Sequence, residues 1–327
     1  MKKFKHVVVI GGGTGIYPVT SALKDLDHVK TSIIVGVADN GGSTGRIRDE
    51  FGFPPVGDLR QQLAALTKDE SQEWIRKLLL YRFKKGHGLK GHNLGNLILT
   101  ALQDMTENTT EALVRATQIF RLEGKVIPAS NQNLNLIVLY EDGSQKLGEN
   151  YLNPESRIEK KVVGIKLTPA AQASPAARAS IEEADFIIIG PGDMYGSLLP
   201  TIMPQGFKAS FKKSRAKVIY ITNLMTRYLQ TDDLAAGDHL AMIEQAIGKK
   251  VDFVVINDDG IPQNLLANYA QNHEYPVEND LVSDRRVIEA SIVFKQKIEA
   301  EEHDGLERSY LRHDSQKLQN LLKKIIK

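Results

Sequence analysis

The chain has 327 residues and its charges nearly cancel, with 42 lysines and arginines against 40 aspartates and glutamates. A balanced charge argues against the broad basic surface that binds nucleic acids. The lack of cysteine excludes disulfides, thiolate metal sites and cysteine nucleophiles. A chain of this length is able to form one large α/β domain or two smaller domains.

The first predicted strand, over 6–10, runs directly into the glycine-rich turn Gly11-Gly12-Gly13-Thr14-Gly15. Glycine allows a sharp turn and lets a phosphate approach main-chain N–H groups without a Cβ in the way. A helix that begins after such a turn adds its free amides and its dipole to an anion site. Gly12, Gly13 and Thr14 are therefore candidate ligand-binding residues. The apolar run is too short for an export signal or a membrane span, so we expect a cytoplasmic protein without membrane insertion.

A second predicted strand, over 32–37, leads into a turn that carries Asp39, Asn40, Ser43 and Arg46. NAD-binding folds place their ribose-binding carboxylate at the end of the second strand, so NAD is one candidate cofactor. The polar residues that follow Asp39 favour a diphosphate or a hydrated metal instead. The alternative for all these glycines is that they only shape tight connections between strands and helices.

Asp58 begins the next predicted helix and has two interpretations. It either caps that helix, or it joins Asp39 as a hard oxygen ligand of Mg²⁺ on a phosphate, which makes Mg²⁺ a second candidate cofactor. Arg46 and Arg60 are each able to hold a phosphate bidentately, with surface ion pairing as the alternative.

Helical patterns follow one another without a strong strand between them, and we interpret them as a helical insertion of about 58–122. Its predicted helices cover 58–67, 72–83, 94–105 and 109–122. Asn93 stands where a helix cap is expected. Asn96 is harder to explain by the helix alone, because asparagine is a mediocre helix former and its amide suits ligand hydroxyls.

After the predicted helices, Asp142-Gly143 favours a tight reversal between strands over 134–140 and 145–152, with a further strand near 161–167. Another buried strand, over 185–189, runs into Gly190-Pro191-Gly192, and Ser197 follows as a helix cap or a phosphate contact. No spacing here is typical of a hydrolase nucleophile.

Strands are also predicted over 217–221 and 252–256, and Asn223 follows the first of them at the sheet edge where open α/β proteins bind ligands. An amphipathic helix over 314–326 ends the chain. Continuous apolar strands that alternate with helices predict one α/β domain with a mostly parallel sheet, a helical insertion and a small antiparallel hairpin region.

The glycine turns, together with Pro55-Val56-Gly57-Asp58-Leu59-Arg60 and Asn93-Leu94-Gly95-Asn96-Leu97, come in a characteristic order. With this ordered set the chain resembles the gluconeogenesis factor family (YvcK-type), which is similar to the 2-phospho-L-lactate transferases (CofD-like superfamily). The resemblance implies a Rossmann-like three-layer fold. It also implies a cytosolic regulatory protein that binds a UDP-sugar of the UDP-N-acetylglucosamine or UDP-glucose class and links carbon metabolism to cell-wall synthesis and cell shape.

The resemblance further implies that Tyr269 and Arg312 contact the sugar nucleotide, and that Asp39 and Asp58 hold a metal or substrate. The chain departs from the family pattern in two places. Arg227-Tyr228-Leu229-Gln230-Thr231 stands where Gln-Pro-Gly-Glu-Thr is usual, and Asn272-His273-Glu274 stands where a Glu-Gly-Ala element is expected. Both departures fall in loops expected to face the ligand.

These observations leave several functions open. The first is a non-catalytic UDP-sugar sensor that acts through protein partners of cell-wall or carbon metabolism, because no nucleophile or general base stands out. The second is an Mg²⁺-dependent transferase that cleaves a pyrophosphate-linked donor, and the third is an NAD-binding protein. A homodimer is the commonest assembly for such a protein.

Overall fold

A computed structural model describes residues 4–39, 42–68, 71–152, 158–294 and 311–327. Its centre is a seven-stranded sheet in the order β10-β9-β8-β7-β1-β2-β3, in which every neighbouring pair is parallel. The strands are β1 (Lys5–Gly11), β2 (Val29–Val35), β3 (Lys125–Pro128), β7 (Phe186–Ile189), β8 (Lys217–Ile221), β9 (Phe253–Asn257) and β10 (Val287–Ala290).

The predicted α/β class with a mostly parallel sheet is confirmed. β1, β2, β7, β8 and β9 are the strands that the sequence predicts, and each is a continuous apolar run because helices cover both of its faces. β3 and β10 were not predicted. Each has four residues at an edge of the sheet, and β10 is only partly buried, so neither presents a long apolar run.

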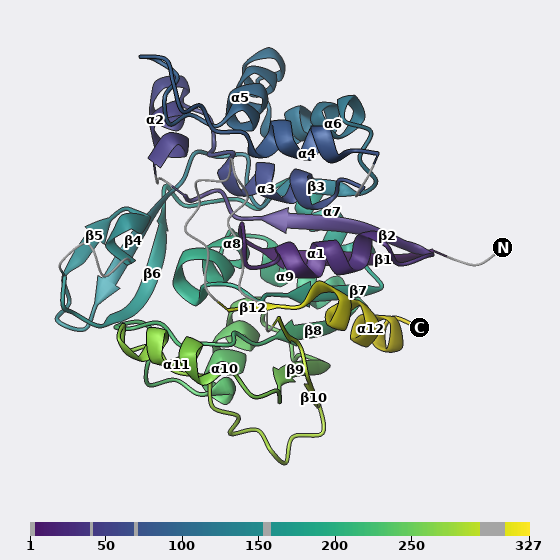
Figure 1. Ribbon diagram of the computed structural model, residues 1–327, viewed down its shortest axis with the longest axis vertical. Helices are drawn as coiled ribbons and strands as arrows, with labels where there is room; N and C mark the ends of the chain where they lie inside the picture. Colours follow the sequence, from purple (N-terminus) through teal and green to yellow (C-terminus); the bar gives the residue numbers. More distant parts are fainter. Residues whose placement is uncertain (1–3, 40–41, 69–70, 153–157, 295–310) are drawn as a thin grey trace.

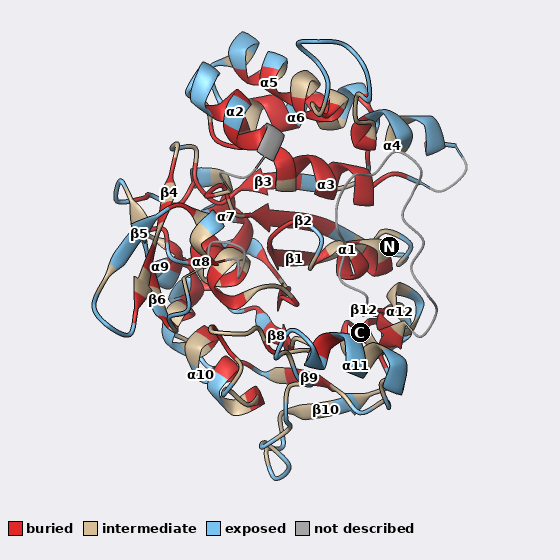
Figure 2. Ribbon diagram, turned by 60° about the vertical axis from the view of Figure 1, so that its left-hand side comes forward, coloured by how far each residue is buried: buried red, intermediate tan, exposed pale blue. Residues whose placement is uncertain are grey.

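Side chains alternate between the two faces of the sheet and join two separate cores. Val7 and Val9 of β1 pack with α1 (Tyr17–Lys24), α3 (Gly57–Ala65) and α12 (Ser315–Ile325). Val8 and Ile10 face the other way, against α7 (Pro175–Glu183), α8 (Leu199–Ile202), α9 (Phe207–Lys213) and α10 (Ala236–Ile247). Figure 2 shows the strands as the buried middle layer of this arrangement.

The helical region between β2 and β3 contains α2 (Gly42–Phe51), α3, α4 (Glu73–Leu80), α5 (Leu94–Thr106) and α6 (Thr109–Ile119). In Figure 1 these helices lie beyond β2 and β3, at the end of the sheet opposite β9 and β10. Four of them match the predicted helices. α2 was not predicted, because the glycine turn after Asp39 continues directly into it.

A small antiparallel sheet in the order β5-β4-β6 stands beside the main sheet (Figure 1). It consists of β4 (Asn135–Tyr140), β5 (Gln145–Leu147) and β6 (Val162–Thr168), as the Asp-Gly reversal predicts. The predicted strand over 145–152 is too long, because β5 ends at Leu147 and a 3-10 turn, Glu149–Leu152, follows it. The remaining elements are a π-helical turn (Met194–Leu198), α11 (Gln263–Ala270) and the short antiparallel pair β11 (Val293–Phe294) and β12 (Arg312–His313), which leads into α12.

Candidate functional site

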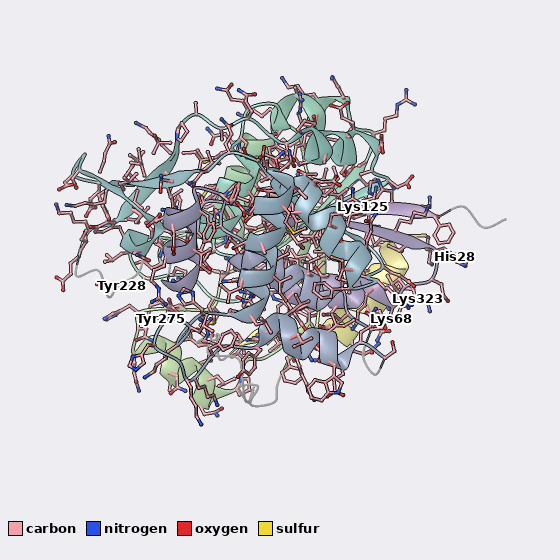
Figure 3. The ribbon with its side chains drawn as sticks, turned by 90° about the horizontal axis from the view of Figure 1, so that it is seen from above. His28, Lys68, Lys125, Tyr228, Tyr275 and Lys323 are labelled. Atoms are coloured by element: carbon pink, nitrogen blue, oxygen red, sulfur yellow. The ribbon has the colours of Figure 1, made fainter. Side chains whose placement is uncertain are left out.

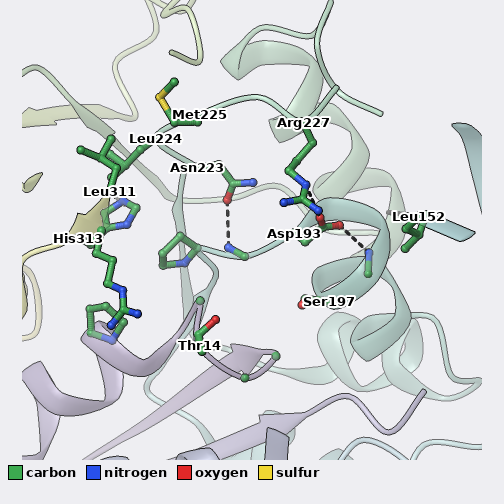
Figure 4. A pocket seen from close by; sticks show the side chains of 18 of the residues that line it. Thr14, Leu152, Asp193, Ser197, Asn223, Leu224, Met225, Arg227, Leu311 and His313 are labelled. Atoms are coloured by element: carbon green, nitrogen blue, oxygen red, sulfur yellow. Dashed lines mark hydrogen bonds and ion pairs between the residues drawn. The ribbon is translucent and has the colours of Figure 1, made fainter. Parts of the chain in front are cut away.

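The site lies where the order of strands reverses, because β1 has β2 on one side and β7 on the other. Open α/β sheets bind ligands at the carboxyl ends of the strands beside such a switch point. A cavity of about 570 Å³ opens there, and Figure 4 shows its interior. Its walls include ten of the predicted site residues: Gly12, Gly13, Thr14, Asp39, Asp58, Gly192, Ser197, Asn223, Tyr269 and Arg312.

The first and third glycine turns lie against each other at this point. A Cβ built on Gly15 would stand 2.6 Å from the carbonyl oxygen of Pro191, and one on Gly12 would stand 2.7 Å from Ser197 Oγ and 2.9 Å from Asp58 Oδ2. Both separations are shorter than van der Waals contact. Only glycine fits at Gly15, where the obstacle is backbone, and a side chain at Gly12 would have to displace Ser197 and Asp58. The turns therefore gather on one side of the molecule, around one cavity.

The first turn offers main-chain donors to a ligand. Gly13 is held from both sides, because its N–H donates to the Asp58 carboxylate and its carbonyl accepts from Gln62 Nε2 at 2.6 Å. Within the described residues, the amides of Gly12, Thr14 and Gly15 have no acceptor. Helix α1 begins two residues later, and no side chain caps its N-terminus. Free amides and a helix dipole at the edge of a cavity form an anion site.

The third turn has a different role, because its amides are already used. Gly192 N donates to Asn223 Oδ1 at 3.0 Å, and Gly196 N donates to Asp193 Oδ1 at 2.7 Å. Gly190 does not line the cavity. Its φ is +76° and an added Cβ would stand 2.9 Å from the Ile221 carbonyl, so glycine is needed there to shape the turn.

Asp39, Asp58 and Glu149 form a group of interacting carboxyls on the cavity wall. Burial, and then the charge of Asp39, raises the pKa of Asp58 to about 7, against the opposing effect of Arg60. Burial also raises the pKa of Glu149 well above its usual value, helped by the charges of Asp39 and Asp58 and by a hydrogen bond to Asp39. Burial and mutual repulsion thus oppose ionisation of Asp58 and Glu149, and a cation beside them would favour the charged forms.

Asp39 and Asp58 suit Mg²⁺ in chemistry, since both offer hard oxygen atoms and both repel each other in its absence. The described residues contain no group of three or more acidic or histidine side chains that could hold a metal ion. Magnesium commonly completes its shell with water and phosphate oxygens, so two carboxylates beside a bound diphosphate fit this ion.

Asn93 is the cap of α5. Its side chain accepts from Asn96 N at 3.1 Å and its amide donates to the Leu80 carbonyl at 2.9 Å, while the residue is fully buried. Asn96 is also buried and donates to Thr44 Oγ1 at 3.3 Å, which ties α5 to α2. Neither lines the cavity, and both contacts described here are structural.

We expect Asn93→Ala to lower the free energy of unfolding by about 2 kcal/mol, because it removes a cap and leaves a buried carbonyl without its donor. Urea unfolding at neutral pH measures this loss. Ligand affinity should stay unchanged; a weaker affinity at unchanged stability would instead place Asn93 in the site.

The second glycine turn is only partly described. Asn40 lies outside the described residues, and so does the side chain of Ser43. Arg46 is exposed and approaches Gly91, with its Nη2 3.6 Å from the position of an added Cβ. Burial lowers the pKa of His92, and the charge of Arg46 lowers it further. Arg46 thus faces the loop before α5 and does not line the cavity.

Two segments from the C-terminal third complete the wall. Tyr269 of α11 is 7% exposed, and its hydroxyl accepts from Leu311 N at 3.1 Å. This bond fixes the strand β12, from which Arg312 and His313 reach the cavity. Burial lowers the pKa of His313 to about 4, so this histidine is neutral at pH 7.

Sequence reasoning missed several charged residues of the wall, among them Glu149, Asp193, Arg227 and Glu274. Glu149 follows the hairpin of the antiparallel sheet, and nothing in the sequence places that hairpin beside the first turn. Asp193 could have been predicted as a site residue, because it directly follows the third glycine turn. Arg227 and Glu274 stand within the two departures from the family pattern.

Residues 7–297 match the family of the 2-phospho-L-lactate transferase CofD. The chain belongs to the CofD family. Gluconeogenesis factors from other organisms are also similar to it along most of its length. The gluconeogenesis factor of Bacillus subtilis is 34% identical over 325 residues, which cover 98% of both chains. The gluconeogenesis factor of Halalkalibacterium halodurans is 38% identical over 280 residues, covering 85% of this chain and 84% of that protein.

A solved structure supports the same fold for this CofD family member. The crystal structure of a UPF0052 family protein from Bacillus halodurans superposes with a TM-score of 0.87 at 34% identity, and it covers 99% of each chain. The Rossmann-like α/β arrangement is therefore shared with an experimental structure. Within the described residues, no helix is long and apolar enough to span a membrane.

Proposed function

We propose that this protein is a cytosolic regulatory protein that binds a UDP-sugar of the UDP-N-acetylglucosamine or UDP-glucose class. By that binding it would link gluconeogenic carbon metabolism to cell-wall synthesis and cell shape, acting through protein partners and as a homodimer. Relatives that are called gluconeogenesis factors and match nearly the whole chain support this role.

The free amides of the first glycine turn carry the proposal. Gly12, Thr14 and Gly15 present N–H groups without acceptors in the described structure, at the start of α1 and on the cavity wall. A diphosphate is the part of a nucleotide sugar that such amides recognise. A volume of about 570 Å³ is in the range of cavities that enclose small molecules and cofactors.

Mg²⁺ would reconcile a diphosphate with the acidic wall. Asp39 and Asp58 would hold the ion, and its charge would offset both the carboxylates and the phosphates. Without the ion, the diphosphate would be repelled by these carboxylates, or they would have to be protonated before it binds. The affinity for the UDP-sugar should therefore depend on Mg²⁺.

A thermal-shift panel tests the proposal with UDP-N-acetylglucosamine, UDP-glucose, GTP and NAD, each with and without Mg²⁺. A ligand that binds only the folded protein raises its melting temperature. We expect the UDP-sugars to give the largest shifts, and larger ones with Mg²⁺. A larger shift with NAD would support the NAD-binding alternative, and no shift with any UDP-sugar would contradict the proposal.

Asp39→Asn should weaken UDP-sugar binding by about 1–3 kcal/mol, the usual effect of losing a charged hydrogen-bond partner. Isothermal titration calorimetry with Mg²⁺ present measures it. Asp104→Asn is the matched control, because Asp104 is an exposed aspartate of α5 outside the cavity. Equal affinity of the Asp39 variant and the wild type would remove Asp39 from the site.

The acidic group favours one second function, an Mg²⁺-dependent transferase that cleaves a pyrophosphate-linked donor. A carboxyl with a pKa of about 7, such as Asp58, is suited to accept a proton from an attacking hydroxyl at neutral pH. Incubation with a labelled sugar nucleotide and candidate acceptors decides between the two functions. Labelled product that depends on Asp58 would favour the transferase over the sensor.

A further inference from the structure

Arg227 stands on the cavity wall in the loop after β8. Its Nε lies 3.3 Å from Asp193 Oδ2 and 3.8 Å from Glu274 Oε1, so two carboxylates hold one edge of the guanidinium. Figure 4 shows the side chain descending toward Asp193, on the opposite side of the cavity from His313. Neither the family comparisons nor the sequence motifs give this arginine a role.

The loop that carries Arg227 is well supported. Arg227 N donates to Thr231 Oγ1 at 3.0 Å, and the Arg227 carbonyl accepts from Thr231 N at 2.8 Å. Gln230 Nε2 donates to the Leu152 carbonyl at 2.8 Å, which ties the loop to the antiparallel sheet. The base of the side chain is therefore fixed before any ligand arrives.

The loop is also joined to the segment that supplies Glu274. Thr226 N donates to the Tyr275 carbonyl at 2.7 Å, and the rings of Tyr228 and His273 lie 4.8 Å apart. Figure 3 shows Tyr228 and Tyr275 close together at one end of the molecule. The two departures from the family pattern thus form one structural unit at the rim of the cavity.

The other edge of the guanidinium is available. Within the described residues, Arg227 Nη1 and Nη2 make no hydrogen bond, and both ion pairs of the side chain are made at Nε. The second carboxylate oxygen of Asp193 is not available to these two nitrogens, because it already accepts a hydrogen bond from Gly196 N. Two parallel N–H donors in a fixed plane match two oxygens of one phosphate.

The cavity wall around Arg227 carries more acidic than basic side chains. Among the residues that the structure describes, five carboxyls line the cavity, from Asp39, Asp58, Glu149, Asp193 and Glu274, against the two arginines Arg227 and Arg312. A diphosphate entering this cavity needs fixed positive charge beyond the amides of the first turn. Arg227 is positioned by the acidic wall to supply it.

We propose that Arg227 is a ligand-binding residue that holds one phosphate group of the bound ligand through Nη1 and Nη2. Asp193 and Glu274 act as positioning residues that set the plane of the guanidinium. The inference rests on the proposed function, because it names the residue that recognises the diphosphate of the sugar nucleotide.

The test compares wild type, Arg227→Gln and Arg227→Lys in calorimetry with UDP-N-acetylglucosamine and with inorganic pyrophosphate, both with Mg²⁺. We expect Arg227→Gln to lose roughly tenfold or more in affinity for both ligands. Arg227→Lys should recover only part of this loss, since lysine keeps the charge but not the fork. Arg115→Gln is the matched control, because Arg115 pairs with one carboxylate on α6, away from the cavity.

The outcomes separate the two ideas. Unchanged affinity of Arg227→Gln for a UDP-sugar that the wild type binds would overturn the role of Arg227 alone. Binding of pyrophosphate but not of UDP-sugars, with loss in Arg227→Gln, would overturn the proposed ligand and keep the phosphate contact. Binding of neither by the wild type would overturn both. If Arg227→Gln fails to fold, full wild-type affinity of Arg227→Lys overturns the bidentate contact.

Discussion

Replacing Asp58 by asparagine is expected to stabilise the folded protein, and to do so much more at pH 8 than at pH 5. The pKa of Asp58 is about 7 in the folded chain and 3.8 in the absence of perturbation. The folded state therefore holds this proton more tightly than the unfolded state. As pH rises from about 4 through about 7, ionisation costs the wild type stability, and the variant has no such cost.

The expected gain at pH 8 is on the order of a few kcal/mol, since one pKa unit corresponds to about 1.4 kcal/mol. Urea unfolding at both pH values, without divalent cations, measures it. Asp104→Asn serves again as the exposed control and should change stability at neither pH. Added Mg²⁺ should narrow the difference at pH 8, because the ion stabilises only the wild-type carboxylate. Equal stabilisation at both pH values would contradict the raised pKa.

Gly13→Ala is expected to abolish ligand binding and to lower stability by about 3 kcal/mol or more. The φ of Gly13 is +28°, and an added Cβ would stand 2.3 Å from Asp58 Oδ1. The methyl group therefore combines backbone strain with a clash against a buried carboxyl. It also disturbs the turn whose neighbouring amides face the cavity. Thermal unfolding and calorimetry with a UDP-sugar measure the two effects.

Gly143→Ala is the matched control for Gly13→Ala. Gly143 also has a positive φ, +82°, but nothing lies within 4 Å of an added Cβ at the tip of the hairpin. This variant should lose only the cost of backbone strain, about 1 kcal/mol, and bind ligand normally. Similar losses of stability and of ligand affinity in both variants would mean that the Asp58 carboxyl does not obstruct a side chain at Gly13.

The central sheet was predictable because its long strands carry continuous apolar runs. β1 and β7 are examples, in which the apolar run ends at a glycine turn. The edge strands β3 and β10 were not predictable, because a segment of four partly apolar residues cannot be told from a short loop by its sequence. Their place is set by tertiary pairing with β2 and β9, which local pattern does not reveal.

The candidate site was predictable where its residues follow a strand. Asp39, Gly192 and Asn223 each come directly after a buried strand, and parallel strands bring their carboxyl ends to one edge. Asn93 and Arg46 belong to the same region of the sequence as Asp58, but neither side chain lines the cavity. Asn93 caps α5, and Arg46 is exposed on the surface. Spacing along the chain does not tell which way a side chain faces.

Glu149 shows the limit of that reasoning most clearly. Its carboxyl hydrogen bonds to Asp39, although more than a hundred residues separate them. The 3-10 turn that carries Glu149 follows a sheet that has no strand paired with the central sheet. The turn after β5 therefore supplies part of the cavity wall, although its sheet shares no strand pairing with the central sheet. Transferring the proposed binding site to another protein would therefore require this segment as well as the central sheet.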